Sequence, residues 1–357
     1  MSLIKNNSDF LFGFEAILTN ANGDPDQENK PRMDYDTSTL LVSDARRKRD
    51  VRDFLKRKGY RIFVDTLSDD KVSMEVMFLK IVKDYLSDKT KMKELLNRNS
   101  MLKDKFEKYF NESKDNLYEV YEKKYMKEKA KQNNKRDKDF SKLDDILLTE
   151  IIKESLIDIR LFGSAMAVNN VNKTYTGPIQ MNWGYSLHPV EIIKSNSITS
   201  IMNNDNSTFG NKYKVYYALV SHYGVINKYS AKLTGMTEKD KSLFRKALVQ
   251  GMMNNQTDSK QDQNPLFYFE IVYKPEFDGY LGDLRRFIDI GYDENKPIRD
   301  IKDLKIDFSR LNSTIEHLKQ KGYIEKIIGW EHPLARNINL PEYESVDLLE
   351  PIEKVED

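Results

Sequence analysis

The sequence predicts an α+β fold: a ferredoxin-like domain that carries a helical insertion and a hairpin excursion. Two observations predict it. A strand, helix, strand pattern occurs twice along the chain, which is the element order of a split β-α-β domain. A long stretch of charged, helical sequence separates the two copies, and 357 residues leave room for about two domains.

The first copy of the pattern lies near the N-terminus. Residues 12–18 form an apolar run typical of a central strand. In residues 20–34, Asn, Gly, Asp and Pro are too dense for a helix or a ladder to persist, so a long loop is expected. From 39 to 59 the apolar residues recur at helical spacing, and Ser43 can cap this helix. Residues 61–65 then predict a strand.

The insertion and the second copy follow. Residues 72–86 predict an amphipathic helix, and the charged stretch from there to about residue 140 predicts one or two solvated helices. An acidic C-terminal tail is expected to be frayed. The other predicted elements are a helix at 143–156, a strand-like run at 159–168, an excursion such as a hairpin at 194–212, strands at 213–226 and 266–275, and helices at 237–253 and 307–322.

Composition restricts the function classes. Lys and Arg number 58 against 57 Asp and Glu, so the whole molecule has no long-range attraction for polyanions, and any such site must be a local patch. The absence of cysteine excludes disulfides, thiol nucleophiles and Cys-ligated metals. No apolar run approaches a membrane span and no signal-peptide pattern is present, so we expect a soluble, cytoplasmic protein with no membrane partner.

A basic helix is the strongest local signal. Lys48, Arg52 and Lys56 recur every fourth residue, so they line one face of the predicted helix. Such a stripe can follow the phosphates of a nucleic acid, each contact adding to the salt dependence of binding. The alternative is an ordinary solvated basic face. Only three aspartates interrupt eight cations in this segment, which favours a face that stays positive.

Motifs for metal binding and catalysis are weak. Asp24, Asp26 and Glu28 alternate as in a calcium loop, but an EF-hand starting at Asp24 needs Gly and Glu where the chain has Asn29 and Tyr35. The residues favour a shaped turn over a metal site. The four histidines show no ligand or triad spacing, and the common phosphate, dinucleotide and serine-hydrolase motifs are absent. We therefore predict no catalytic residue, no metal and no cofactor.

Several separated motifs together resemble one family. On these residues the sequence resembles the backbone (Cas7-type) subunit of type I CRISPR Cascade complexes, part of the RAMP superfamily, and within it the type I-B branch. The motifs span most of the chain. They are NANGDPD at 20–26 with Asn29, Pro31, Arg32 and Asp34; Ser43 and Asp44 followed by Lys48, Arg49 and Arg52; DIRLFG at 158–163; GPIQ at 177–180; YGVIN at 223–227; and TEKD at 237–240.

The resemblance implies a molecule built like a right hand. An RRM-like palm would comprise residues 1–72 and 156–357, with a thumb hairpin at about 195–212, and residues 73–155 would form an inserted helical finger domain. Copies would stack head-to-tail into a filament along CRISPR RNA (crRNA), each thumb folding over a displaced base. Guide bases between the thumbs would pair with target DNA, so the protein holds shape while base pairing reads sequence.

The implied function is a non-catalytic RNA-binding backbone subunit in antiviral defence. Its partners would be crRNA, target DNA, other copies of itself, the large subunit and the handle-binding subunits of Cascade. Apolar residues of the polar excursion, Ile201, Met202 and Phe209, are the expected thumb wedge. The expected RNA-binding residues are Asn20, Asn22, Lys30, Arg32, Arg46, Lys48, Arg49, Arg52, Lys56 and Gln180.

Two other functions compete with this one. Related backbone subunits of type III complexes cut target RNA with a loop aspartate and a divalent metal, and Asp24, Asp26 or Asp34 could act in the same way. The resemblance to the type I branch disfavours that alternative. The basic face could instead dock on an acidic protein partner. The RNA-binding scaffold remains the leading hypothesis because the residues and the resemblance agree on it.

Overall fold

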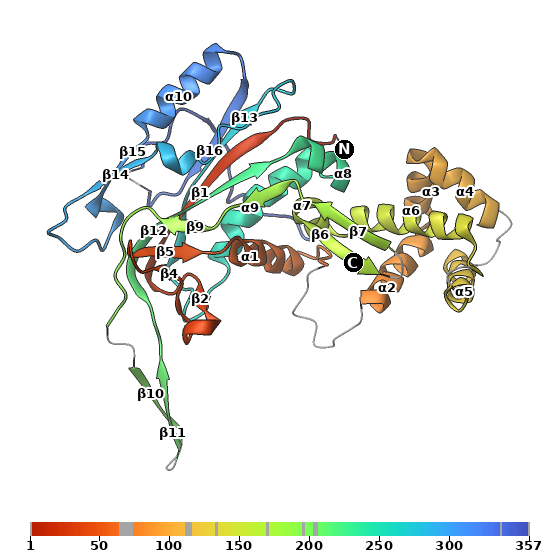
Figure 1. The fold of residues 1–357 in the computed structure, drawn as a ribbon, viewed down its shortest axis with the longest axis horizontal. Helices are drawn as coiled ribbons and strands as arrows, with labels where there is room; N and C mark the ends of the chain where they lie inside the picture. The colour runs from red at the N-terminus through yellow and green to blue at the C-terminus, as the bar shows by residue number, and fades with distance from the viewer. Residues whose placement is uncertain are drawn as a thin grey trace. The chain divides into compact units, whose positions relative to one another are not determined.

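The computed structural model describes residues 2–63, 74–110, 116–132, 135–168, 171–194, 197–202, 206–335 and 338–355. The chain divides into two compact units (Figure 1). The first comprises Met1–Tyr60 and Gly177–Asp357, and the second comprises Arg61–Thr176. The second unit therefore extends further at both ends than the insertion predicted at 73–155.

A mixed sheet forms the centre of the first unit. β1 (Ser8–Thr19) pairs antiparallel with β12 (Val215–Ile226) on one side and with β13 (Gln263–Tyr273) on the other. The strand order is β17-β16-β13-β1-β12-β9-β5-β4; β8 also pairs with β12, and β16 and β17 are parallel. The remaining strands are β4 (Met33–Asp34), β5 (Thr39–Val42), β8 (Ile179–Met181), β9 (Gly184–Ser186), β16 (Ile324–Glu331) and β17 (Glu344–Ser345).

Two helices cover one face of this sheet. α1 (Asp44–Arg57) packs along α9 (Glu238–Met253), and Phe10 of β1 meets Phe244 of α9 edge to face, with ring centroids 5.7 Å apart. The helices cross closely at Gly251, where a Cβ would lie 2.8 Å from a backbone oxygen of α1. A larger residue there would force the two helices apart.

The opposite face of the sheet is covered as well. Leu11 of β1 and Phe267 of β13 belong to a buried cluster that includes Leu311 and Ile315 of α10 (Ser309–Gln320). Side chains alternate between the faces of a strand, so β1 must be apolar on both sides. Its aromatic residues therefore lie in the core and not on an open face.

Several short elements decorate the first unit. β10 (Ser197–Met202) and β11 (Asn206–Asn211) form an antiparallel hairpin, as predicted for the polar excursion. The side chains of the expected wedge residues Ile201, Met202 and Phe209 lie outside what the structure describes. The others are β2 (Gly23–Asp24), η1 (Pro25–Gln27), β3 (Lys30–Pro31), α8 (Lys228–Thr234), η3 (Leu284–Phe287), β14 (Asp289–Tyr292), η4 (Ile301–Asp303) and β15 (Leu304–Asp307).

The second unit has its own core. Aromatic residues supply much of it, among them Phe106, Phe110, Tyr121 and Phe140. The charged stretch is thus not one or two solvated helices, because a few large aromatic side chains bury enough area to join all these helices. Its elements are α2 (Met74–Ser87), α3 (Lys89–Arg98), α4 (Ser100–Phe110), α5 (Leu117–Lys129), α6 (Lys138–Ser155), α7 (Ile157–Phe162), β6 (Gly163–Val168) and β7 (Val171–Thr176).

Some predicted elements are confirmed and others are wrong. The predicted helix at 237–253 is α9, with the expected capping box between Thr237 and Asp240. The predicted helix at 39–59 instead starts at Asp44, because residues 39–42 alternate between buried and half-buried positions in β5. None of the described helices is long and apolar enough to cross a membrane.

Two apolar runs were assigned the wrong structure. Residues 61–63 of the strand predicted at 61–65 form no strand, and residues 64 and 65 lie outside the described part of the chain. The run at 159–168 is split between α7 and β6, with Gly163 at φ +69° where the helix ends. Short apolar runs fit a buried helix as well as a buried strand, so periodicity could not decide.

The acidic tail is packed and not frayed through residue 355. Leu348 and Ile352 are buried. Gln250 of α9 donates from its amide to the backbone oxygens of Leu348 and Glu350 at 2.8 and 2.9 Å. The prediction of a frayed tail considered only its acidic residues. Burial of its apolar residues holds the tail against the rest of the unit.

A buried ion cluster joins α9 to β13. Glu270 is fully buried, and its carboxylate meets the Lys241 Nζ at 2.8 Å and the Arg245 Nε at 2.7 Å. The Tyr268 hydroxyl also donates to it at 2.8 Å. Burial alone would raise the pKa of Glu270, but the charges of Arg245 and Lys241 outweigh burial and hold the pKa well below its usual range.

We predict that Glu270→Gln lowers the free energy of unfolding by about 3–5 kcal/mol, because it leaves two buried cations without their counter-charge. Urea denaturation measures the change. Glu350→Gln is the matched control, since its partner Lys246 forms an exposed pair with it, and little change is expected there. Equal effects of the two substitutions would contradict the importance of the buried cluster.

Candidate nucleic-acid interface

The loop that follows β1 is a shaped turn fixed by its own amides. The Asn20 Nδ2 donates to the backbone oxygen of Asn29 at 2.8 Å. The Asn22 Oδ1 accepts from both the backbone N–H and the hydroxyl of Ser43, each at 2.8 Å. Glu28 and Asn29 adopt positive φ of 53° and 59°, as the predicted turn requires. The loop is thereby tied to the start of α1.

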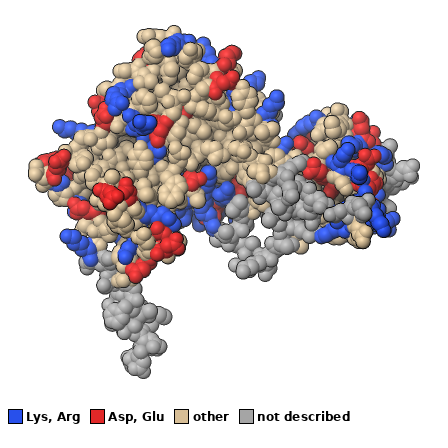
Figure 2. All heavy atoms as spheres, viewed as in Figure 1, with Lys and Arg blue, Asp and Glu red and all other residues tan. Residues whose placement is uncertain are grey.

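The first turn of α1 presents backbone donors beside this loop. Ser43 is the N-cap, and its hydroxyl accepts from the backbone N–H of Arg46 at 3.3 Å. The helix dipole makes this end positive, and helix N-termini of this kind favour anions. Figure 2 shows Lys and Arg side chains gathered at the place that α1 occupies in Figure 1.

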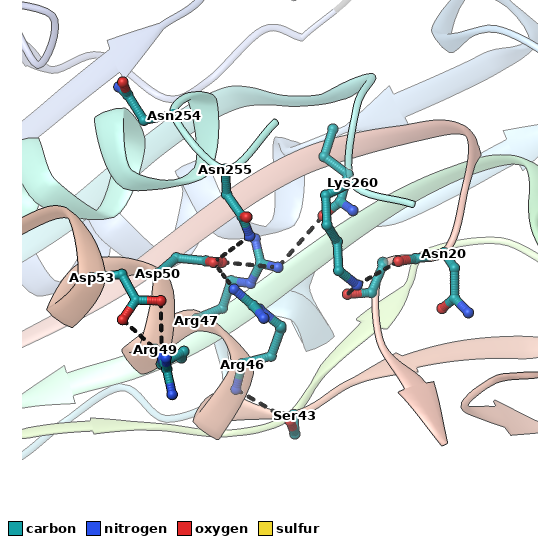
Figure 3. Close-up of polar contacts among 12 residues, drawn as sticks. Asn20, Ser43, Arg46, Arg47, Arg49, Asp50, Asp53, Asn254, Asn255 and Lys260 are labelled. Carbon is teal, nitrogen blue, oxygen red and sulfur yellow. Dashed lines mark hydrogen bonds and ion pairs between the residues drawn. The ribbon is translucent and has the colours of Figure 1, made fainter. Parts of the chain in front are cut away.

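Three cations and one carboxylate lie behind this turn, and we call them the cation cluster: Arg46, Arg47, Asp50 and Lys260. Arg46 forms an ion pair with Asp50, and the Arg47 Nη2 lies 3.2 Å from the same carboxylate. Lys260, from the loop after α9, donates from its Nζ to the Asn20 backbone oxygen at 2.6 Å (Figure 3). The cluster itself holds three basic side chains and one carboxylate, so it carries an excess of positive charge.

Burial strengthens the electrostatics of the cluster. Burial, and then the nearby charges of Arg46 and Arg47, lower the pKa of Lys260 to about 7, although Asp50 opposes this shift. Arg47 is only 1% exposed, and burial lowers its pKa to about 10. A lowered pKa means that the protein disfavours the charged form of these side chains. A bound anion would stabilise that charged form and raise the pKa again.

Several buried polar atoms at the cluster lack a hydrogen-bond partner among the described residues. They include three donors, the Nε atoms of Arg46 and Arg47 and the Nη1 of Arg47, and one acceptor, the Oδ1 of Asn20. Buried donors without partners are costly, and native sites with several of them usually complete the set with water or a ligand. The chemistry of the cluster suits a phosphate, which is anionic and accepts from several donors.

The predicted basic stripe is partly neutralised along the helix. The Lys48 Nζ lies 2.8 Å from Asp44, and the Arg49 Nε lies 2.7 Å from Asp53. Arg52 and Lys56 are half-buried further along α1. Ion pairs at partly exposed positions contribute little to stability, so a phosphate can replace an aspartate at small cost.

The other predicted residues lie on the loop and on β8. The Lys30 Nζ lies 5.1 Å from the centroid of the Tyr213 ring. The Arg32 guanidinium meets Asp24 at 3.3 Å and lies 5.8 Å from the centroid of the Trp183 ring. Gln180 is exposed on β8, and its amide donates to the backbone of its own turn. The structure brings Asn20, Asn22 and Arg46 together with Lys260. Gln180 pairs with Val225, whereas Thr19 pairs with Val215 at the other end of β12, so Gln180 lies away from this group.

Sequence reasoning missed Lys260 and Trp183. Lys260 lies in a polar loop, where nothing in the local pattern distinguishes it from other surface lysines. Arg47 was counted as one more cation of the basic helix, although the structure buries it beside Phe14, 5.0 Å from the ring centroid. Trp183 does carry a signal, since it is one of 2 tryptophans and stands between the polar Asn182 and Gly184.

Two of the three loop aspartates accept hydrogen bonds within the loop. Asp24 accepts from the backbone of Asp26 at 3.2 Å, and Asp34 accepts from the Thr37 hydroxyl at 2.8 Å. The hydrogen bond from Thr37 lowers the pKa of Asp34. In the described ranges, no three His, Cys, Asp or Glu side chains lie close enough to share a metal ion.

Solved structures similar to this chain include two chains from complexes titled CRISPR RNA-guided surveillance complex, one of them in a pre-nicking state. The pre-nicking chain is 16% identical, with a TM-score of 0.47, and the match covers 96% of this chain and 97% of that one. The second is 12% identical, with a TM-score of 0.46, and the match covers 96% and 94% of the two chains.

Sequence comparisons identify the family. CRISPR-associated protein Cas7 of Haloferax volcanii is 24% identical over 331 residues, which cover 91% of this chain and 87% of that protein. The family model for CRISPR-associated protein Cas7 matches residues 6–309, most of the chain. The chain therefore belongs to the Cas7 family of CRISPR-associated proteins.

Proposed function

We propose that this chain is a non-catalytic, RNA-binding backbone subunit of a type I CRISPR effector complex, of the type I-B branch. Copies of it line up head-to-tail along crRNA and present the guide for pairing with target DNA. The cation cluster and the helix start beside it carry the proposal, because they offer a phosphate several donors and an unbalanced positive charge. The titles of the similar solved chains, which name RNA-guided complexes, support it.

The sheet order supports an RRM-like palm for this subunit. β1 lies between β12 and β13, and α1 and α9 cover one face, which is the arrangement of a split β-α-β domain. Since the other face is covered by α10, RNA must bind at the loop and helix start beside the sheet edge. The β10–β11 hairpin is the proposed thumb, with Ile201, Met202 and Phe209 as its wedge over a displaced base.

The rest of the assembly follows from this role. The second unit, with α2 to α7, is the proposed finger domain. Other copies, the large subunit and the handle-binding subunits are the proposed protein partners. A neutral chain with acidic and basic surface regions suits head-to-tail contacts, which need two different complementary surfaces on one molecule.

We predict that Lys48→Ala combined with Arg52→Ala weakens binding of single-stranded RNA equally for unrelated guide sequences. Each lost phosphate contact lowers the slope of log affinity against log salt by roughly 0.7. Fluorescence anisotropy at several salt concentrations measures both quantities. Arg310→Ala with Lys319→Ala is the matched control, because it removes the same charge from α10 on the covered face. Effects that depend on the guide, or that the control shares, contradict this assignment.

We also predict that RNA affinity falls by about tenfold from pH 6.5 to pH 8.5 at constant ionic strength. Lys260 has its pKa near 7 in the free protein, and a bound phosphate raises that pKa, so above pH 7 binding must take up a proton. Lys260→Arg keeps the charge and should flatten the profile.

Two other groups with shifted pKa values lie near Lys260. Burial lowers the pKa of Arg47 only to about 10, so it stays charged, and burial lowers the pKa of His222 beside Arg47 to about 3, so this histidine stays neutral. An equal pH dependence in wild type and Lys260→Arg would show that another group is responsible.

The non-catalytic role makes a further prediction. The assembled complex, incubated with Mg²⁺ and an RNA complementary to the guide, should leave that RNA intact on a denaturing gel. Regularly spaced cuts that disappear in Asp24→Ala, Asp26→Ala or Asp34→Ala variants would favour a type III-like metal-dependent nuclease instead.

A further inference from the structure

Trp183 is a large apolar side chain left exposed beside the cation cluster. It lies in the connection between β8 and β9 and is 46% exposed, whereas the chain's other tryptophan, Trp330, is 6% exposed in the core. Exposed tryptophans are unusual on a surface this polar, and one beside a binding site suggests contact with a ligand.

The backbone on both sides of Trp183 is anchored. The Arg285 Nη1 donates to the Trp183 backbone oxygen at 2.7 Å, and Arg285 is itself held by an ion pair with Asp283 at 2.7 Å. The backbone N–H of Asn182 donates to the oxygen of Tyr223 at 2.9 Å. The ring is therefore attached to a backbone that is already fixed, so packing a flat ligand on it would cost little conformational entropy.

The register of the sheet places Trp183 beside the start of α1. Gly184 pairs with Val42, so the next position of this antiparallel pair brings Trp183 opposite Ser43, the N-cap. Gly184 has no room for a side chain, because a Cβ would lie 2.6 Å from the imidazole of His222. The exposed ring and the phosphate-binding donors are thus neighbours on one edge.

Charge also favours a nucleotide over an apolar protein partner. Arg32 lies 5.8 Å from the ring centroid, and its own counter-ion Asp24 is partly exposed. A flat ring with a guanidinium over it combines two features that single-strand binding proteins use for bases, since every base has a π-face and Arg adds a cation–π contribution.

We infer that Trp183 and Arg32 form a stacking platform for one nucleobase of the RNA whose phosphates bind at the start of α1. This inference rests on the proposed function and adds a base contact to its backbone contacts. Stacking uses the face of the base and leaves its pairing edge free. The platform therefore adds affinity without reading sequence.

The test compares a single-stranded RNA with an RNA of the same length in which all positions are abasic. Trp183→Ala should weaken binding of the normal RNA by roughly tenfold, and Trp183→Phe by much less. Wild type and Trp183→Ala should bind the abasic RNA equally, because only phosphates are left. Normal RNA should also quench the fluorescence of wild type, since Trp330 is buried, and leave that of Trp183→Ala unchanged.

Tyr292→Ala serves as the control, because it removes another exposed aromatic ring, from β14, and should bind like wild type. Equal affinity of wild type and Trp183→Ala for the normal RNA would overturn the platform and leave the proposed function standing. A loss that persists with abasic RNA would also overturn it. If wild type binds neither RNA, the proposed function fails and the platform fails with it.

Discussion

The excess of positive charge at the start of α1 is the constraint on which the rest of the site depends. Arg46 and Arg47 share one carboxylate, Asp50, and Lys260 lies near enough for the charges of all three residues to shift its pKa. Asn22 ties the preceding loop to the same helix start. The protein therefore has a local positive site in a chain whose net charge is only +1, and we propose that a polyanion binds at this site and not to the molecule as a whole.

The covered sheet determines where such a polyanion can bind. In an RNA-recognition sheet, aromatic side chains on an open face stack with bases. Here α10 closes that face, and the corresponding aromatic residues, such as Phe267, lie in the core. The proposed RNA contact therefore lies at the sheet edge, where the loop, the helix start and Trp183 meet. Contacts to the RNA phosphates at this edge would leave the bases accessible, as the proposed presentation of a guide for pairing requires.

Local sequence pattern could predict much of the fold but only part of the site. The capped helix α9 and the long apolar strands β12 and β13 follow from periodicity and capping. The α7–β6 region did not, because a short apolar run fits either structure until its packing is known. The proximity of Lys260 to Asp50 could not be predicted from the sequence, because it arises only when α1 packs against the loop after α9. The burial of Arg47 was likewise a tertiary effect.

The most direct measurement compares the affinities of the purified chain for two single-stranded RNAs of equal length and unrelated sequence over a range of salt concentrations. The account predicts that the two RNAs bind with the same dissociation constant and the same steep salt slope, because the cation cluster contacts phosphates and the platform accepts any base. A preference of more than tenfold for one sequence, or binding that ignores salt, would contradict it.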